Sequence, residues 1–197
     1  MSDIKGLTKL DGEVLKHLRA VEYLKIRNCD ELRYLWDSES EACRFLVKLQ
    51  TLYVFECEML VSMEEKEVNV GSSNMKSVIR EVTLEYCDSL RSYKCPNSVE
   101  RLEIYKCSSM TSLTLSTTLQ ELPSSLKSLE LCFCSHLNSF PHERLQSLTS
   151  LEEMQMYYCE SMDESFPCGL WPPNLRSLKI GMLKKPMSEW ELPNLTY

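Results

Sequence analysis

One pattern of apolar residues recurs seven times along the 197-residue chain. Each copy places apolar residues at fixed intervals before a cysteine and one more apolar residue three positions after it. The copies read VEYLKIRNCDELRYL, LQTLYVFECEMLVSM, IREVTLEYCDSLRSY, VERLEIYKCSSMTSL, LKSLELCFCSHLNSF, LEEMQMYYCESMDES and LRSLKIGMLKKPMSE. Only the last copy departs from the pattern, with leucine in place of the cysteine and proline in place of the final apolar residue. A chain with such a repeat is expected to fold as a stack of similar units.

The cysteine of each copy, or the leucine that replaces it in the last copy, is called the column residue. Successive column residues are separated by 20 to 30 positions, about 26 on average, which matches the period of leucine-rich repeats. They are Cys29, Cys57, Cys87, Cys107, Cys134, Cys159 and Leu183. In each unit the alternation apolar, variable, apolar indicates a short strand with one buried face. The sequence therefore predicts an α/β leucine-rich-repeat solenoid of about seven repeats. Its parallel sheet would line the concave side, and irregular or short helical segments the convex side.

The sequences of several repeats resemble one family more closely than they resemble the general leucine-rich-repeat consensus. The stretches VEYLKIRNCDELRYLW, YKCSSMTSL and ESMDESFPCGLWPPNLRSLKIGMLKKPMSEW resemble the C-terminal repeats of plant disease-resistance proteins of the coiled-coil, nucleotide-binding, leucine-rich-repeat type. The resemblance spans roughly residues 7–197. It implies a protein-binding module that recognises a pathogen effector or a modified, guarded host protein, and that restrains the nucleotide-binding domain of the same receptor if the chain is a fragment.

Two other binding functions stay open at this stage. The substrate-receptor repeats of F-box ubiquitin ligases also carry a cysteine column, and a free-standing decoy or scaffold would need no further domain. The residues that follow the cysteines here, such as DEL, EML, DSL and SSM, favour the immune-receptor type. The family's phosphate loop and coiled coil have no counterpart among these residues, so nucleotide binding is not carried over to this chain.

The expected organisation has three parts. Residues 1–17 form a partial N-terminal cap or a degenerate repeat, residues 18–187 hold the repeats, and residues 188–197 begin a truncated further repeat. Ile4, Leu7, Leu10, Val14 and Leu18 follow helical spacing, which fits either an amphipathic helix or a degenerate leading repeat. The polar stretches 37–44 and 63–76 are expected to be solvated loops on the convex side.

The composition, the net charge and the length of the apolar runs argue against some classes of function. Lys and Arg number 22 against 29 Asp and Glu, a net charge of −7, which argues against a protein that follows nucleic-acid phosphates. The longest apolar runs are far shorter than the roughly 20 residues of a membrane span. The start of the chain has no apolar signal sequence, so we expect a cytoplasmic protein whose cysteines are reduced.

The segment Cys132-Phe133-Cys134-Ser135-His136 raises the question of a metal or redox site. Strand alternation predicts that Cys132 lies on the exposed face and Cys134 in the interior, so the two would not share a metal ion. A ladder of disulfides along the column is an alternative to buried thiols, and the redox states of Cys43, Cys95, Cys132 and Cys168 are open as well. The histidines lie outside the expected strands, so no catalytic residue, metal or cofactor is predicted.

The outward positions of the expected strands give the candidate binding face. Aromatic rings there, beside charges of both signs, suggest anchors for a protein partner. The alternative explanation is the general preference of strands for aromatic residues. The predicted partner-binding residues are Tyr53, Phe55, Glu85, Tyr86, Glu103, Tyr105, Lys106, Glu130, Phe133, Tyr157 and Tyr158.

Overall fold

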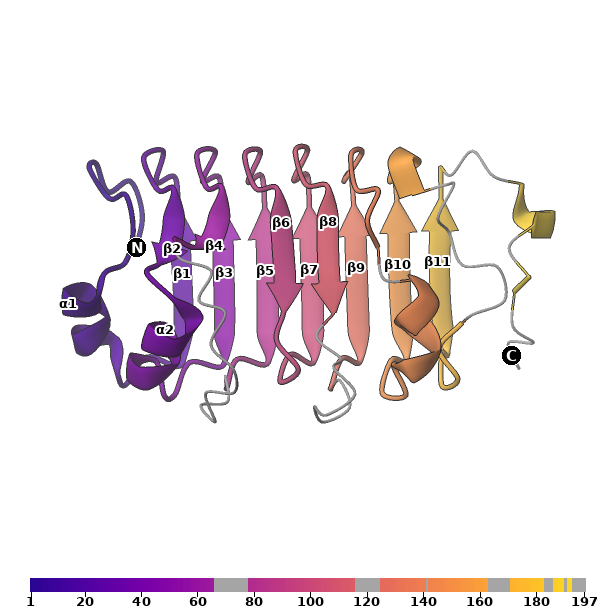
Figure 1. Ribbon diagram of the computed structural model, residues 1–197, viewed down its shortest axis with the longest axis horizontal. Coiled ribbons are helices and arrows are strands. Elements are labelled where there is room, and N and C mark those ends of the chain that lie inside the picture. The colour runs from indigo at the N-terminus through magenta and orange to yellow at the C-terminus, as the bar shows by residue number, and fades with distance from the viewer. Residues whose placement is uncertain are drawn as a thin grey trace.

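A row of parallel strands runs the length of the molecule in the computed structural model (Figure 1). The structure describes residues 1–65, 78–115, 125–140, 142–162, 171–182, 186–189 and 191–192. The strands, in their order across the sheet, are β1 (Tyr23–Arg27), β3 (Thr51–Phe55), β5 (Glu81–Glu85), β7 (Arg101–Tyr105), β9 (Ser128–Cys132), β10 (Glu153–Tyr157) and β11 (Ser177–Gly181). Each strand pairs in register with the next, for example Ile26 with Val54, so equivalent positions of the repeat form straight columns across the sheet.

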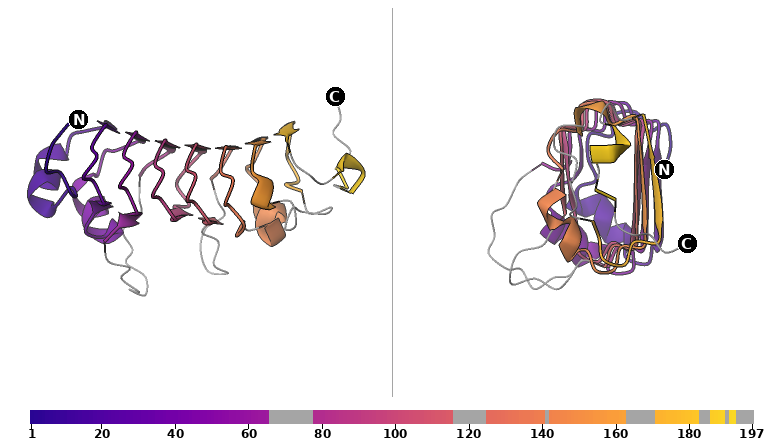
Figure 2. Two further views of the ribbon diagram at one scale, coloured as in Figure 1. Left: turned by 90° about the horizontal axis from the view of Figure 1, so that it is seen from above. Right: turned by 90° about the vertical axis from the view of Figure 1, so that its right-hand side faces the viewer.

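Shorter elements form the other side of the body. Two small parallel sheets, β2 (Tyr34–Trp36) with β4 (Ser62–Glu64) and β6 (Ser92–Cys95) with β8 (Ser112–Leu115), lie in front of the long sheet in Figure 1. The helical elements are α1 (Gly12–Leu15), η1 (Lys16–Leu18), α2 (Glu39–Phe45), η2 (His142–Ser147), η3 (Glu160–Met162) and η4 (Met187–Glu189). Figure 2 shows the long sheet as a gently curved row, with α2 and η2 on one side of it and α1 and η4 near its two ends. The predicted leucine-rich-repeat solenoid is confirmed, but the small convex strands were not predicted.

The stretch 37–44 corrects one expectation, because most of it is helical instead of a solvated loop. Ser38 caps α2 by accepting a hydrogen bond from the backbone N–H of Glu41 at 3.3 Å. Ala42 and Phe45 of this helix are buried in the core. The sequence contained the signal, since a serine followed three residues later by glutamate is typical of a helix N-terminus. The predicted loop at 63–76 lies for the most part outside the described residues.

The inward positions of each repeat build one continuous core. The two inward residues of β7, Leu102 and Ile104, are fully buried, as are Cys107 and the next apolar residue, Met110. Between them the backbone N–H of Met110 donates to the carbonyl of Cys107, closing a tight turn. The same turn follows the strand in each of the first six repeats. A unit this short buries its apolar side chains only against its neighbours, which is why the units stack.

The two ends of the stack differ. At the N-terminal end, Ser2 pairs with Arg27 beside β1 and Leu10 pairs with Trp36 beside β2. Residues 1–11 therefore lie along the edges of both sheets and do not form the amphipathic helix that spacing from Ile4 suggested. At the other end, the inward residues Leu178 and Ile180 of β11 are only partly buried. The domain boundaries given above stay predictions, and most of residues 188–197 lie outside the described part.

Candidate binding face

The residue directly before each column position has an unusual backbone conformation. Its φ angle is positive in every described repeat, between 49° and 60°, although none of these residues is glycine. They are Asn28, Glu56, Tyr86, Lys106, Phe133, Tyr158 and Met182. The left-handed conformation costs an ordinary residue about 1 to 2 kcal/mol. It turns the chain from the strand into the core, so that the cysteine is enclosed while the preceding side chain stays at the rim of the strand face.

Rings from the strands and from this rim form an unbroken aromatic row. Successive ring centroids lie 6.1, 5.5, 5.7, 5.2 and 4.4 Å apart, within the range of favourable aromatic contacts. The members of the aromatic row are Tyr53, Phe55, Tyr86, Tyr105, Phe133 and Tyr158. All are partly exposed, and Tyr158 is the most open at 38%. The sequence predicted each ring on this face but could not predict that they touch.

Cations lie over the rings of the row. Lys25 Nζ is 4.0 Å from the centroid of Tyr53, and Lys106 Nζ lies 5.0 to 5.8 Å from the centroids of Tyr86, Tyr105 and Phe133. Such contacts contribute about 0.5 to 1 kcal/mol at exposed sites. Lys106 therefore helps to hold the middle of the row in place, and it offers a positive charge beside three rings.

Carboxylates on the same face are held mainly by neutral donors, with one ion pair. Glu85 accepts a hydrogen bond from Tyr53 Oη at 2.8 Å, and Glu130 accepts one from Gln155 Nε2 at 2.8 Å. Glu103 accepts from Thr83 at 3.3 Å and lies 3.7 Å from the guanidinium of Arg101. Partial burial, followed by the hydrogen bond to Glu85, raises the pKa of Tyr53 to about 12. The face is thus a mixture of rings, carboxylates and a few cations.

Tyr157 belongs to the same face but not to the aromatic row. A Cβ atom added to Gly181 would come within 2.6 Å of Tyr157 Cδ1 and Cε1, so this ring lies against the bare backbone of β11. The glycine at this outward position is therefore explained by the close approach of the ring.

Cys132 corrects the prediction of a surface thiol, because only 4% of it is exposed. Its direction was predicted correctly, since it pairs with Tyr105 and Tyr157 in the outward column. These neighbours are much larger than a cysteine, and Cys132 Sγ lies 3.6 Å from a Glu130 oxygen. Burial raises the pKa of Cys132 to about 11.

The Cys132, Cys134 and His136 side chains do not converge. Cys134 lies in the core, where its thiol is 3.6 Å from the carbonyl of Cys132, and His136 Nδ1 is 2.7 Å from the carbonyl of Ser108. Within the described ranges no group of three or more His, Cys, Asp or Glu residues is arranged to hold a metal ion. Within the same ranges no helix is both long and apolar enough to cross a membrane.

The six column cysteines are fully buried and are not disulfide-bonded. Their sulfur atoms lie near the carbonyl two residues back, as in Cys29 to Arg27 at 3.3 Å and Cys159 to Tyr157 at 3.5 Å. Hydrogen bonding to Cys87, followed by burial, holds the pKa of Cys107 well above its usual range. Cys43 and Cys95 are not disulfide-bonded either, whereas Leu183 and Cys168 lie outside the described residues.

Comparisons with known proteins give little beyond this geometry. No protein-family model matches the chain, and a search of curated proteins gives no significant match. Among solved structures, the chain is similar to the leucine-rich repeat domain of the type III effector XopL, with a TM-score of 0.48 and 15% sequence identity. That similarity covers 92% of this chain and 79% of the other. The chain's own repeats therefore identify it as a leucine-rich-repeat solenoid.

Proposed function

We propose that this solenoid is a protein-binding module and that its strand face, centred on the aromatic row, is the binding surface. The observation that carries the proposal is a line of six partly exposed, mutually touching rings on a sheet face that no other described element covers. Aromatic residues held rigid by their neighbours lose little entropy when they bind, which makes them strong anchors in protein interfaces.

The finer proposal follows the family resemblance. The module would act in plant immunity, in the cytoplasm, and recognise a pathogen effector or a host protein that an effector modifies. It would also help to hold a receptor's nucleotide-binding domain inactive. The mixed charges beside the rings, among them Glu103, Lys106 and Glu130, would select the partner, since charge complementarity contributes more to specificity than to affinity.

Capture of partners from plant leaf extract tests the surface. The bait carrying Tyr105→Ala and Phe133→Ala is expected to lose the proteins that the unaltered chain retains. The matched control is Tyr34→Ala, which removes a partly buried tyrosine from β2 in the small sheet. Circular dichroism would verify that all baits are folded. Equal capture by all three baits would remove the strand face from consideration.

The identity of the captured proteins separates the candidate roles. A pathogen protein or its host target, lost with the double substitution, supports the immune role. Retention of a ubiquitin-ligase adaptor would support the F-box alternative. Binding of host proteins unrelated to infection would favour a free-standing decoy or scaffold. No catalytic residue, cofactor or metal enters the proposal, which rests on the aromatic anchors and the selective charges alone.

A further inference from the structure

The carboxylates at outward positions of the long strands are already engaged within the protein. Each accepts a hydrogen bond from a side chain of a neighbouring strand, as Glu81 does from Thr51 Oγ1 at 3.3 Å. The full set is Glu81, Glu85, Glu103, Glu130 and Glu153. Carboxylates without such a donor, Glu56 and Glu58 among them, lie in the turns beyond the strand ends. The negative charge of the strands is therefore used in contacts between repeats.

Three cations that lie over the aromatic row form no ion pair within the described ranges of the chain. They are Lys25, Arg27 and Lys106. Each contacts rings instead, and Arg27 Cζ, for example, is 5.8 Å from the centroid of Phe55. Cations elsewhere are paired with carboxylates, as Lys127 is with Glu100. The charge that lies over the rings is thus positive and unbalanced, although the whole chain carries a net charge of −7.

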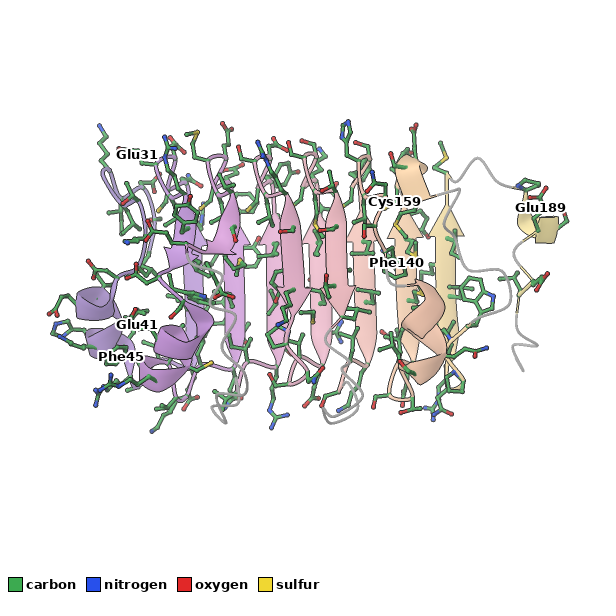
Figure 3. All side chains as sticks on the ribbon, viewed as in Figure 1. Glu31, Glu41, Phe45, Phe140, Cys159 and Glu189 are labelled. Carbon is green, nitrogen blue, oxygen red and sulfur yellow. The ribbon has the colours of Figure 1, made fainter. Side chains whose placement is uncertain are left out.

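The rings of the aromatic row follow the spacing of the repeats. Figure 3 shows Cys159, the residue after Tyr158, at the arrowhead end of β10, and the rim part of the row lies along this edge of the sheet. From Phe55 to Tyr158 the row crosses four intervals between repeats, with successive centroids 4.4 to 5.7 Å apart. Because neighbouring strands lie about 4.8 Å apart, a partner that runs along the row meets a new ring at about that interval.

An α-helix matches this spacing better than an extended strand does. A helix rises about 5.4 Å per turn and presents one row of side chains at steps of three and four residues. Residues on one face of an extended strand are about 6.8 Å apart. Over four intervals of about 4.8 Å, the helix departs from the row by about 2.4 Å and the strand by about 8 Å, which exceeds one whole repeat. The helix therefore keeps one side chain near each ring.

We infer that the partner element bound along the aromatic row is an amphipathic α-helix with acidic side chains beside its apolar stripe. Its apolar side chains pack between successive rings, and its carboxylates accept hydrogen bonds from Lys25, Arg27 and Lys106. Two of these cations belong to β1, so the more acidic end of the helix lies over that strand. This inference rests on the proposed binding face and names the structure and the charge that the face selects.

Three fluorescein-labelled peptides test the inference by fluorescence anisotropy at low salt. The glutamate peptide is two copies of Leu-Glu-Ala-Leu-Leu-Glu-Ala, an amphipathic helix about 21 Å long with its carboxylates on one flank. The glutamine peptide has the same shape without the charge, and the proline peptide has proline in place of the two central alanines, which breaks the helix. We expect the glutamate peptide to bind at least about tenfold more tightly than either of the others, although the net charge of −7 by itself favours the neutral peptide. Equal or reversed affinities in either comparison would overturn the inference.

Two triple variants locate the contact on the protein. The first removes the cations over the rings and carries Lys25→Gln, Arg27→Gln and Lys106→Gln. The matched control removes as much charge from exposed positions outside the strand face and carries Lys48→Gln, Arg91→Gln and Lys94→Gln. The first should bind the glutamate peptide at least about tenfold more weakly, and the control should change by less than about threefold. Equal losses would overturn the inference, because the affinity would then come from net charge.

Thermal melting verifies that both triple variants are folded. Lys106→Gln alone disturbs the face least and repeats the test if the first triple variant melts early. It should lose about threefold in affinity for the glutamate peptide, and no loss would count against the inference.

Failure of the inference and failure of the proposed binding face give different results. If the Tyr105→Ala, Phe133→Ala bait loses a captured protein while the glutamate peptide binds no better than the glutamine and proline peptides, the binding face stands and the acidic helix does not. If neither that bait nor the triple cation variant loses any captured protein, the strand face itself is not the surface.

Discussion

The inward and outward side chains of the long sheet alternate along the same strands, yet they follow different rules. Inward positions hold leucine, isoleucine, valine or methionine and are nearly fully buried from β1 to β10. Outward positions vary from lysine to glutamate to tyrosine and are mostly half-buried. The comparison teaches that the inner side fixes the stack through uniform packing, whereas the outer side is free to differ between repeats and so to carry specificity.

The largest effect should come from truncating an inward residue of a central strand. Ile104→Ala is expected to lower the free energy of unfolding by about 2 to 5 kcal/mol, because a cavity remains between fully packed neighbours. Glu103→Ala, one residue earlier on the outward side, should cost less than about 1 kcal/mol. Urea denaturation followed by circular dichroism measures both. Similar losses for the two variants would contradict the division between the faces.

The two cysteines of one repeat sharpen the comparison further. Cys134→Ser should lower the unfolding free energy by about 1 to 3 kcal/mol, because a hydroxyl is more costly than a thiol to bury among apolar groups. Cys132→Ser should cost less, since Glu130 and Gln155 lie beside that position and can hydrogen-bond a hydroxyl. Both residues are nearly inaccessible to solvent, so only the surroundings differ. A larger loss at Cys132 in the same denaturation assay would refute the explanation.

The rim residues with a positive φ angle allow a substitution that should raise the free energy of unfolding instead of lowering it. Glu56→Gly removes the conformational cost at a φ of 49° and should raise the unfolding free energy by up to about 1 kcal/mol, after the gain in unfolded-state entropy is subtracted. Glu58→Gly, two residues on and without a positive φ, should lower it by about 0.5 to 1 kcal/mol. Melting temperatures of opposite shift would support the strain, and shifts of the same sign would not.

The smallest predicted effect concerns the titration of one phenol. The pKa of Tyr53 is raised to about 12, so the folded state holds this proton more tightly than the unfolded state does. The resulting stability is complete below the ordinary value of 10.0 and is lost as the pH rises from there to about 12. Ultraviolet titration of phenolate should show one late-ionising tyrosine that disappears in Tyr53→Phe. Glu85→Gln should make it ionise earlier, and an unchanged titration would rule out the hydrogen bond as a cause.

Most of the fold was predictable from the sequence because its determinants are periodic. The apolar pair of each strand and the cysteine that follows recur at fixed spacing, and stacking converts that spacing into a parallel sheet. The helix α2 was not predicted, although Ser38 followed three residues later by Glu41 is typical of a helix N-terminus. The strands β2 and β4 were missed because segments of three residues have too few positions to show a period.

The sequence predicted which side chains of the binding face point outward, but not how they pack against one another. Alternation placed Cys132 outward correctly, yet it says nothing of the size of the neighbours that cover it. The left-handed rim was not foreseen because Tyr86 and Phe133 are residue types that rarely adopt such a backbone. Such details depend on packing between neighbouring repeats.

The partial exposure of Leu178 and Ile180 has a consequence for the dynamics of the solenoid. In a linear array each unit is stabilised mainly by contacts with its neighbours, so local opening should start in a unit whose inward residues are only partly buried. Amide hydrogen exchange is therefore expected to be fastest in β11 and to slow progressively toward the middle strands. The aromatic row extends from β3 to the turn after β10, and most of it would stay rigid while the last strand opens and closes.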